Sequence, residues 1–507
     1  MSTRHAETER TYDLPDQAAT LPDLAAATDG VVVSVTDAGT DELEATYVDT
    51  DDLQLIRRRV TLRRRTGGAD AGWHLKLPPE GDTRQEVHWP LGDSADVPPE
   101  VAAAVTALAT AASLRPVVRL ATSRRRLLLH DGAGATLAEL SDDQVSATLL
   151  DGTGGRSVTV WREVEVELVD GTADALDAVE SALLAAGAVR AVTPSKLARA
   201  LADRLEAASA QPGLSRSSSA GEVLVAYVRE HLERLRRADV DLRLDPDGEG
   251  VHDMRVESRR LRTALGVFRT LFDEATARRL ERELKLLGRV LSQVRDRQVA
   301  SGLLADRLRG SDRADAVIAL YDHELSVDHD RVLAGMRAAL GSGRYTGLLT
   351  GLEALTEEGA LTPVADEPAR TVLADHLRSA LRRLEDDARA ARKSSGAERI
   401  EALHDLRKSA KRLRYACEVV APVAGKPALR MVQRTKELQE VLGNHLDRVA
   451  LAEQLEPLTR LDGATAADGF LLGRLHERLE GEITAAVREH GRAVRRVSDG
   501  KATRWLR

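Results

Sequence analysis

The sequence has 507 residues, which is more than one hydrophobic core usually serves, so its length predicts two or three domains. Hydrophobic residues make up 43% of it, enough to fill those cores. It contains no apolar run of roughly 18 residues or more, and its first residues lack the apolar stretch of a secretory signal. We therefore expect a soluble, cytoplasmic protein and no membrane partner. The single cysteine, Cys417, excludes an intrachain disulfide bond.

The formal charge of −8 is divided unevenly along the chain. Residues 1–210 contain 21 Lys and Arg against 34 Asp and Glu, a net charge of −13, whereas residues 211–507 contain 52 against 47, a net charge of +5. The composition changes at "AASAQPGLSRSSSAG", residues 207–221, and such a Ser, Gly and Pro stretch is typical of linkers. We therefore expect one domain over residues 1–206, a linker over 207–221 and a second domain over 222–507.

The first domain is predicted to be built mainly of strands. Alternation of apolar and polar residues occurs in residues 57–65, 72–78, 83–89, 115–131 and 157–171. Helical patterns interrupt it at about residues 98–112, 172–188 and 194–208. Because strands and helices do not alternate regularly, an antiparallel sheet or barrel is favoured.

Several of these strands carry charge along one face. In "ETERTY", residues 7–12, Glu7 and Glu9 share a face with Thr11, and in "EVEVEL", residues 163–168, the three glutamates share one face. Such charged faces either point to water, as in an ordinary half-buried strand, or line a tunnel whose apolar outer faces are covered by helices. In the second case carboxylates are suited to hold Mg²⁺ or Mn²⁺, and Arg and Lys are suited to hold phosphates. Periodicity leaves both interpretations open.

The second domain is helical in pattern, with breaks near residues 241–250, 309–314 and 355–370. The last break divides it into halves of about 222–355 and 366–507. Each half contains one copy of a motif, "VHDMRVESRRLRTAL" at residues 251–265 and "LHDLRKSAKRLRYAC" at residues 403–417. Spacings of three, four and three residues put the basic side chains of each copy on one stripe of a helix, namely His252, Arg255, Arg259 and Arg262, and His404, Arg407, Lys411 and Arg414.

Like charges along one helix stripe destabilise the helix by some tenths of a kcal/mol for each pair. Because the chain repeats that cost in both halves, we expect the two stripes to converge on a basic groove that binds a polyanion. A plain helical scaffold explains the periodicity but not the duplicated cations. Nucleic acid is disfavoured as the partner, since aromatic residues total only 3% and the net charge is negative.

The doubled motif, with the downstream "VRDRQV" and "HLDRVA", resembles the CHAD family, the conserved-histidine α-helical domain. The resemblance implies two pseudo-symmetric helical bundles with a basic surface that binds inorganic polyphosphate. It assigns the eight stripe residues as phosphate contacts. A polyanion favours protonated histidine, so we expect tighter binding at pH 6 than at pH 8 through His252 and His404. Arg295 has no basic counterpart in the second copy, where Leu446 stands.

The first domain resembles the CYTH family, the triphosphate tunnel metalloenzymes, through "HAETERTYDL", "TRQEVHWPL", "WREVEVELVDG" and "SKLARAL". The resemblance implies a closed antiparallel barrel whose interior binds triphosphate with Mg²⁺ or Mn²⁺. It assigns as metal ligands Glu7, Glu9, Glu163, Glu165 and Glu167, with Glu165 and Glu167 also catalytic. It assigns as phosphate contacts Arg63, Arg65, Lys76, Arg119, Arg126 and Lys196. The family signature Glu-x-Glu-x-Lys is incomplete here, because Thr11 stands in place of the lysine.

The fold expected from these observations is an α+β multidomain chain, with an N-terminal antiparallel tunnel barrel and a C-terminal all-α pair of bundles. The expected function is binding of inorganic polyphosphate, with metal-dependent hydrolysis of tripolyphosphate or polyphosphate in the tunnel. The alternative is a non-catalytic module with a degenerate tunnel, which binds polyphosphate or directs the chain to polyphosphate granules in the cytoplasm. Thr11 favours the alternative, and the retained carboxylates favour the enzyme.

Overall fold

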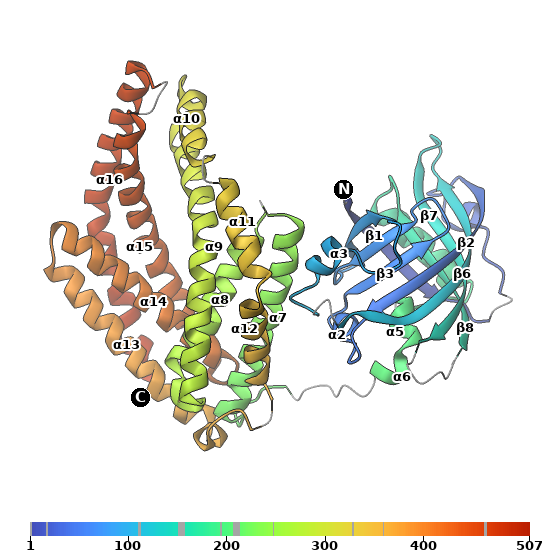
Figure 1. Cartoon of the computed structure of the whole chain (residues 1–507), viewed down its shortest axis with the longest axis horizontal. Coiled ribbons are helices and arrows are strands. Elements are labelled where there is room, and N and C mark those ends of the chain that lie inside the picture. The colour runs from blue at the N-terminus through green and yellow to red at the C-terminus, as the bar shows by residue number, and fades with distance from the viewer. Residues whose placement is uncertain are drawn as a thin grey trace. The chain divides into compact units, whose positions relative to one another are not determined.

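The structure is a computed structural model of the whole chain (Figure 1). It describes residues 3–16, 19–109, 113–150, 158–192, 195–205, 213–246, 248–326, 329–357, 359–460 and 464–506; within these ranges the side chains of residues 295–301, 324–329 and 488 are not described. Arg295 and residues 207–212 of the predicted linker therefore lie outside the description. The chain separates into two compact units, Met1–Gln211 and Pro212–Arg507.

The first unit consists of strands with short helices between them. Its strands are β1 (Thr3–Asp13), β2 (Ser34–Asp49), β3 (Thr61–Thr66), β4 (Gly72–Lys76), β5 (Thr83–Pro90), β6 (Arg115–His130), β7 (Thr136–Leu149), β8 (Val158–Leu168) and β9 (Val189–Arg190). Its helices are α1 (Leu24–Ala27), α2 (Gln54–Arg57), α3 (Pro99–Ala104), α4 (Ala173–Ala185), α5 (Lys196–Ala200) and α6 (Ala202–Leu205).

The strands form one antiparallel sheet in the order β5-β4-β3-β2-β6-β7-β8-β1-β9, and β1 also pairs with β5. This second pairing closes β1 to β8 into a barrel, which confirms the antiparallel barrel predicted from the sequence. The prediction was wrong at residues 57–60, because Arg57 ends α2 and Arg59 has a φ of 60°. The charged run therefore becomes a strand only at Thr61.

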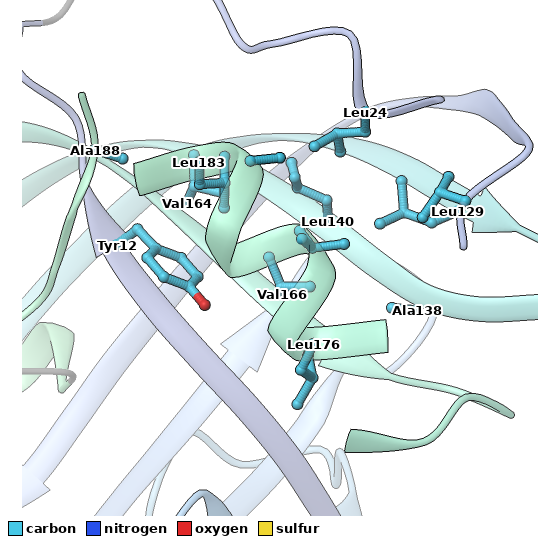
Figure 2. Packing of buried hydrophobic residues seen from close by; sticks show 13 residues of the cluster. Tyr12, Leu24, Leu129, Ala138, Leu140, Val164, Val166, Leu176, Leu183 and Ala188 are labelled. Atoms are coloured by element: carbon cyan, nitrogen blue, oxygen red, sulfur yellow. The ribbon is translucent and has the colours of Figure 1, made fainter. Parts of the chain in front are cut away.

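The apolar face of this barrel points outward and is covered by α4 (Figure 2). Tyr12 of β1 and Val164 and Val166 of β8 are fully buried against Leu176 and Leu183 of the helix. Burial of a leucine side chain stabilises a fold by about 1.5–3 kcal/mol, so this helix contributes substantially to the stability of the barrel. Because successive strand residues point to opposite faces, covering the valines turns the neighbouring glutamates of β8 into the barrel.

A second apolar cluster lies at one end of the barrel interior. Trp161 of β8 and Leu120 of β6 belong to the inward-facing rows. They pack with Leu197, which lies in α5, and with Leu201, which directly follows this helix. The helix begins at Lys196 with Ser195 as its cap, whose side chain accepts a hydrogen bond from the Ala198 backbone. This packing fixes the start of α5, and with it the lysine side chain, beside the polar part of the interior.

The second unit is helical, as predicted. Its helices are α7 (Ala220–Leu244), α8 (Gly250–Val267), α9 (Glu274–Leu308), α10 (Ala314–Ser326), α11 (His329–Leu340), α12 (Gly343–Ala354), α13 (Ala369–Lys393), α14 (Gly396–Ala424), α15 (Lys426–Leu458), α16 (Ala466–Ser498) and α17 (Gly500–Thr503). Short 3-10 turns occupy Arg269–Leu271, Pro363–Asp366 and Arg504–Leu506. The three breaks in the helical pattern fall between α7 and α8, α9 and α10, and α12 and α13.

The two motif-bearing helices of this unit, α8 and α14, pack against each other. Arg260 Nε donates to Glu418 Oε2 at 3.0 Å, and Arg412 Nη2 donates to the Gly266 carbonyl oxygen at 3.0 Å. An apolar cluster that includes Leu304 and Leu479 joins α9 and α10 to α15 and α16. The two copies of the motif are therefore held in one folded unit. Among the described residues, no helix has the length and apolarity needed to cross a bilayer.

Candidate functional site

Strand pairing decides which charged residues of the first unit share the barrel interior. Residues directly opposite each other in neighbouring strands have side chains on the same face. Glu9 lies opposite Glu167, which lies opposite Glu139, and in the next inward row Thr11 lies opposite Glu165. Together with the outward apolar face, this register shows that the charged faces line the tunnel and do not point to water.

These inward rows surround a polar cavity of about 240 Å³. Seven cationic side chains line it, namely Arg63, Arg65, Lys76, Arg84, Arg124, Arg126 and Lys196. Eight carboxylates line it as well, namely Glu7, Glu9, Asp41, Asp70, Glu86, Glu139, Glu165 and Glu167. The cavity thus brings together every tunnel residue expected from the sequence except Arg119 and Glu163.

The ammonium group of Lys196 lies within three carboxylates. Its Nζ is 2.5 Å from Glu165 Oε1, 2.6 Å from Glu163 Oε1 and 3.0 Å from Asp143 Oδ2. Burial by itself would raise the pKa of Glu165, but Lys196 and Arg124 outweigh it and hold that pKa below its ordinary value. The carboxylate of Glu163 also accepts a hydrogen bond from Trp161 Nε1, at 2.5 Å. Glu163 is therefore buried beside the apolar end and does not line the cavity.

A second lysine, Lys76, organises the opposite wall. Its Nζ is 2.6 Å from Glu7 Oε2 and 3.3 Å from Glu86 Oε2. Glu86 in turn contacts His74 Nδ1 at 2.6 Å. Burial lowers the pKa of His74 to about 4 despite the carboxylate. Its other ring nitrogen, Nε2, lies 2.9 Å from the Asp70 carbonyl oxygen, so both ring nitrogens face an acceptor.

Glu7, Glu9 and Glu167 are three carboxylates that line the same cavity and interact with one another. Burial, followed by the charge of Glu7, raises the pKa of Glu167 to about 7, and Glu9 acts in the same direction. Among the described residues, the cations paired with Glu9 are Lys76 at 4.0 Å and Arg84 at 3.8 Å. Carboxylate oxygens are the donors that Mg²⁺ and Mn²⁺ prefer. In the described part of the chain, two groups bring possible metal-binding atoms within 4.8 Å of one another, namely His5, Glu7 and Glu86, and Asp143, Glu163 and Glu165.

Arg119 lies on the outer face of the barrel, which corrects the prediction that placed it in the tunnel. It is more than half exposed, and its Nε lies 3.3 Å from Glu44 Oε1 of the neighbouring strand. Arg119 and Arg126 are seven residues apart in an uninterrupted pairing of β6 with β7, so their side chains point to opposite faces. The arginine that accompanies Arg126 inside is Arg124.

Arg124 is one of several tunnel residues that the sequence analysis missed. It donates from Nε to Asp143 Oδ1 at 2.8 Å and from Nη2 to Glu165 Oε2 at 2.6 Å. The signal was present in the sequence, because Arg124 and Arg126 share one parity of β6. Arg84 and Glu86 share one parity of β5 in the same way, so their signal was present as well. Asp143 follows Asp142 in β7, and two adjacent carboxylates do not show which of them points inward.

Thr11 is buried in the barrel wall opposite Glu165. Arg10, its neighbour in sequence, points outward, where it contacts Asp82 at 2.8 Å and Glu180 of α4 at 2.5 Å. Arg10 therefore cannot supply a cation to the tunnel in place of the missing lysine. Lys196 places an ammonium group at Glu165 from the side of α5.

In the helical unit, the two basic stripes meet at one pocket. It is lined by His252, Arg255 and Arg259 of α8 and by Arg407, Lys411 and Arg414 of α14. Asp447 of α15 lies in the same pocket. A neighbouring pocket contains Arg262 and shares Arg259, Lys411 and Tyr415 with the first. His404 lines neither pocket as described; burial, with Lys408 and Arg407, lowers its pKa.

Two arginines of this pocket have unused hydrogen-bond donors. The buried Nε atoms of Arg259 and Arg407 have no hydrogen-bond partner among the described residues. Burial and the charges around it lower the pKa of Arg259. Arg414, in contrast, donates from Nε to Glu418 Oε1 at 2.9 Å, and its guanidinium lies over the Tyr415 ring. The basic pocket is thus rich in donors that an anion would satisfy.

The tunnel barrel and the doubled basic motif together define a class of protein. Residues 6–201 match the CYTH domain and residues 226–456 match the CHAD domain. The chain belongs to the proteins in which a CYTH domain is followed by a CHAD domain.

Within this class, the chain is 35% identical to the uncharacterised protein Rv2226 of Mycobacterium tuberculosis (strain ATCC 25618 / H37Rv), over 98% of each chain. Two solved structures resemble part of it at 24% identity. PptA from Streptomyces chartreusis matches 54% of this chain and 99% of its own, with a TM-score of 0.45. The CHAD domain from the plant Ricinus communis matches 58% of this chain and 95% of its own, with a TM-score of 0.44.

Proposed function

We propose that the barrel binds a terminal triphosphate with a divalent metal ion and hydrolyses it, and that the helical unit binds inorganic polyphosphate. The observation that carries the first part is the composition of one cavity, in which crowded carboxylates face arginines with unused donors. Metal ligands and phosphate ligands are both needed for phosphoanhydride hydrolysis. Family membership supports the same substrate class.

The proposed metal ligands are the carboxylates of Glu7, Glu9 and Glu167, where like charges crowd together. Bound Mg²⁺ or Mn²⁺ would supply charge neutralisation to phosphate oxygens and Lewis acidity at the reacting phosphorus. Glu163 and Glu165, which the sequence analysis also assigned as metal ligands, hold the Lys196 ammonium group with Asp143. In this proposal Glu163 supports the site through that lysine.

The proposed phosphate ligands are the cations of the opposite wall. The Nε atoms of Arg63, Arg65 and Arg84 are buried and have no hydrogen-bond partner among the described residues. A buried donor left unpaired costs about 1–3 kcal/mol, so an anion that accepts from these atoms gains that free energy on binding. Lys76, Arg126 and Lys196 would neutralise further phosphate oxygens.

In the reaction, the oxygen of a water molecule attacks the terminal phosphorus while the phosphoanhydride P–O bond breaks. Glu165 and Glu167 are proposed as the catalytic residues. Both accept hydrogen bonds from the attacking water, and Glu167, whose pKa is raised to about 7, takes up its proton. The leaving phosphate keeps the electron pair of the broken bond, and the arginines stabilise the negative charge that develops on it.

A non-catalytic barrel is the second candidate, and Thr11 favours it. Threonine brings no charge to the position opposite Glu165, and the only described ammonium at that carboxylate, Lys196, is already shared by two other carboxylates. On this alternative the barrel would bind phosphate chains without turnover, and the whole chain would be a polyphosphate-binding or granule-targeting protein.

Release of phosphate from tripolyphosphate, measured with and without Mg²⁺ or Mn²⁺, decides between the two. We expect metal-dependent release in the wild type, loss of about a hundredfold or more in Glu165→Gln, and wild-type rates in Glu44→Gln, a matched change on the outer face. Thr11→Lys should raise the rate. Absence of release with tripolyphosphate binding intact would establish the non-catalytic alternative.

Binding of polyphosphate by the helical unit is supported by the convergence of both basic stripes and by the unpaired donors of Arg259 and Arg407. The test is the affinity of the full chain for a long phosphate polymer. Arg259→Glu and Arg407→Glu should each weaken it by at least tenfold, because each removes a charge-assisted contact and adds a repulsive charge. Arg460→Glu is the control, since Arg460 is exposed and pairs with Glu456. Equal affinities in all three variants would refute this assignment.

A further inference from the structure

Lys411 lies where the two basic pockets of the helical unit meet. It lines the pocket that contains Arg255 and Arg407, and it also lines the neighbouring pocket that contains Arg262 and Lys285. Its side chain is partly buried. The amine is therefore surrounded by protein but can be reached from either pocket.

The surroundings of this amine are unusually cationic. Among the described residues, no carboxylate forms an ion pair with Lys411, although Asp447 of α15 acts on it from within the pocket. Burial, followed by the charges of Arg407, Arg259 and Arg255, lowers the pKa of Lys411 to about 7. At neutral pH about half of this amine is uncharged, and only the uncharged amine is a nucleophile.

The same pocket offers a place for a phosphate group beside the amine. One unpaired Nε donor belongs to Arg407 of α14, the helix that carries Lys411. The other belongs to Arg259 of α8, which lines the same pocket. A small molecule that joins a phosphate directly to an electrophilic carbon would place that carbon near the amine when the arginines hold the phosphate. Acyl phosphates, the mixed anhydrides of a carboxylic acid and phosphoric acid, have this structure.

We propose that Lys411 is a site of acylation by acyl phosphates. The ε-nitrogen attacks the carbonyl carbon, an amide N–C bond forms, and the C–O bond to the phosphate breaks. The phosphate leaves with the electron pair of that bond and takes up the proton that the nitrogen releases, as hydrogen phosphate. The product amide carries no charge, so the pocket loses one cation.

This inference rests on the cation cluster and is independent of catalysis in the barrel. Its consequence for the helical unit, weaker binding of phosphate polymers after acylation, rests on the proposed function. The two can be separated, because acylation is measured without any polymer present.

The experiment treats the full chain with acetyl phosphate at pH 7 and follows acetylation of each lysine by peptide mass spectrometry. Lys436 of α15 is the internal control, since it is exposed, pairs with Glu440 at 3.9 Å and lines neither basic pocket. We expect Lys411 to be acetylated faster than Lys436 by about tenfold or more. Equal or slower acetylation of Lys411 would overturn the proposal.

Two further arms test the role of the arginines. Arg259→Gln and, independently, Arg407→Gln should lower the acetylation rate of Lys411 severalfold and leave that of Lys436 unchanged. Excess inorganic phosphate should protect Lys411 but not Lys436. Protection of neither lysine, together with wild-type rates in both variants, would show that no phosphate is held beside the amine and would overturn the assignment of acyl phosphates.

A last comparison links acylation to binding. Lys411→Arg keeps the charge but cannot be acylated under these conditions, so acetyl phosphate should weaken polymer binding by the wild type and leave that of Lys411→Arg unchanged. If the untreated wild type binds no polymer, the polyphosphate proposal fails. The acylation proposal is still decided by the acetylation rates, which are measured without polymer.

Discussion

Gly443 of α15 makes room for one of the basic side chains. A Cβ at this position would lie 2.9 Å from the Arg407 Nη2 atom and 3.4 Å from its Nε. The guanidinium group therefore packs directly against the helix backbone, and any larger residue would push it aside. A single glycine thus positions Arg407, a proposed phosphate ligand that lies on another helix.

We predict that Gly443→Ala weakens polyphosphate binding by about tenfold, the value of one charge-assisted hydrogen bond, without unfolding the helical unit. Alanine favours a helix over glycine by about 1 kcal/mol, which offsets the displacement of a flexible side chain. Gly473→Ala in α16 is the matched control, because nothing lies within 4 Å of a Cβ there. Polymer affinity and helical circular dichroism check both variants, and equal affinities would contradict the role of Gly443.

The lowered pKa of Lys411 predicts how the proposed polyphosphate binding should respond to pH. A lysine whose pKa is about 7 is mostly charged at pH 6 and mostly neutral at pH 8, and a polyanion binds the charged form. Polyphosphate should therefore bind more tightly at pH 6, and Lys411→Arg should reduce this difference because arginine stays charged. The groups that face the amine are Arg255 and Arg259 of α8, Arg407 of α14 and Asp447 of α15.

The sequence analysis predicted the same direction of pH dependence but assigned it to His252 and His404. The burial and cationic neighbours of His404 lower its pKa, which makes it a weaker source of charge at pH 6. Affinity titrations at both pH values, with Lys411→Arg and the double variant His252→Ala, His404→Ala, distinguish the two origins. A pH dependence that persists in Lys411→Arg and vanishes in the double variant would favour the histidines.

At the level of elements, strand parity explains which tunnel residues could be predicted. Glu163, Glu165 and Glu167 repeat every second residue of β8, so the sequence alone put them on one face. Arg119 was misplaced because two arginines an odd number of residues apart in one strand cannot share a face. The choice between inside and outside needed the packing of α4 on Val164 and Val166, since apolar residues on one face of a strand do not reveal what covers them.

The long strands β2 and β7 were not predicted from alternation, for physical reasons; β9, with two residues, is too short to show any alternation. The first half of β2 is exposed and contains Thr, Asp and Gly in place of a repeating apolar residue. In β7 the inward positions include Glu139, Ser141 and Asp143, so the buried face is itself polar. The long helices of the second unit were predicted well, because a wide apolar stripe recurs over many turns.

Strand parity also gives a test of the tunnel. Arg126→Ala should weaken tripolyphosphate binding by about tenfold, because it removes an inward cation, whereas Arg119→Ala should leave binding unchanged. Both arginines lie in β6 and have a glutamate partner, so the pair is matched in strand, charge and size of the change. Affinity for tripolyphosphate measured by calorimetry checks the prediction, and a loss in Arg119→Ala equal to that in Arg126→Ala would contradict the register.

The packing of α16 on α15 places two histidines in contact. His445 and His490 lie with their ring centroids 4.7 Å apart, and both nitrogens of His490 are buried without a described hydrogen-bond partner. Burial, followed by the neighbouring His445 and by Arg399 of α14, lowers the pKa of His490 to about 4. His490 is therefore protonated near pH 6.5 in the unfolded chain but only near pH 4 in the folded state.

Because the pKa of His490 is lower in the folded state, the stability of the helical unit should be greatest above about pH 6.5 and fall as the pH drops toward 4, by up to about 3 kcal/mol. His490→Leu should remove most of this dependence. His476→Leu, at an exposed position of the same helix, should not. Denaturant midpoints at pH 7 and pH 5 check this expectation. If His490→Leu lost as much stability as the wild type between the two pH values, the expectation would be contradicted.

At the level of the whole chain, the division of charge separates two kinds of binding. The first unit is strongly acidic in sequence but lines one cavity of its barrel with seven cations, whereas the second unit presents cations along a pocket between helices. A phosphate polymer that binds the second unit should release counterions, and log affinity should fall with log salt by about 0.7 for each phosphate engaged.

We predict that Arg259→Gln lowers this salt slope by about 0.7, whereas Arg126→Ala, inside the barrel, leaves the slope for a long polymer unchanged. Affinities of the full chain measured at several salt concentrations check both. An equal change of slope in the two variants would mean that the polymer engages the barrel as much as it engages the helices.

The barrel has a large apolar cluster on its outer face and a polar, charged cavity within, and this arrangement bears on how such chains evolve. Tyr12, Val164 and Val166 stabilise the barrel wall through apolar contacts on its outer face. Thr11 belongs to neither of the two apolar clusters described for the barrel. A neutral substitution on the inner wall can therefore alter chemistry while the scaffold survives. A tunnel of this kind can therefore lose catalysis during evolution and still bind phosphate, while it stays fused to the same helical domain.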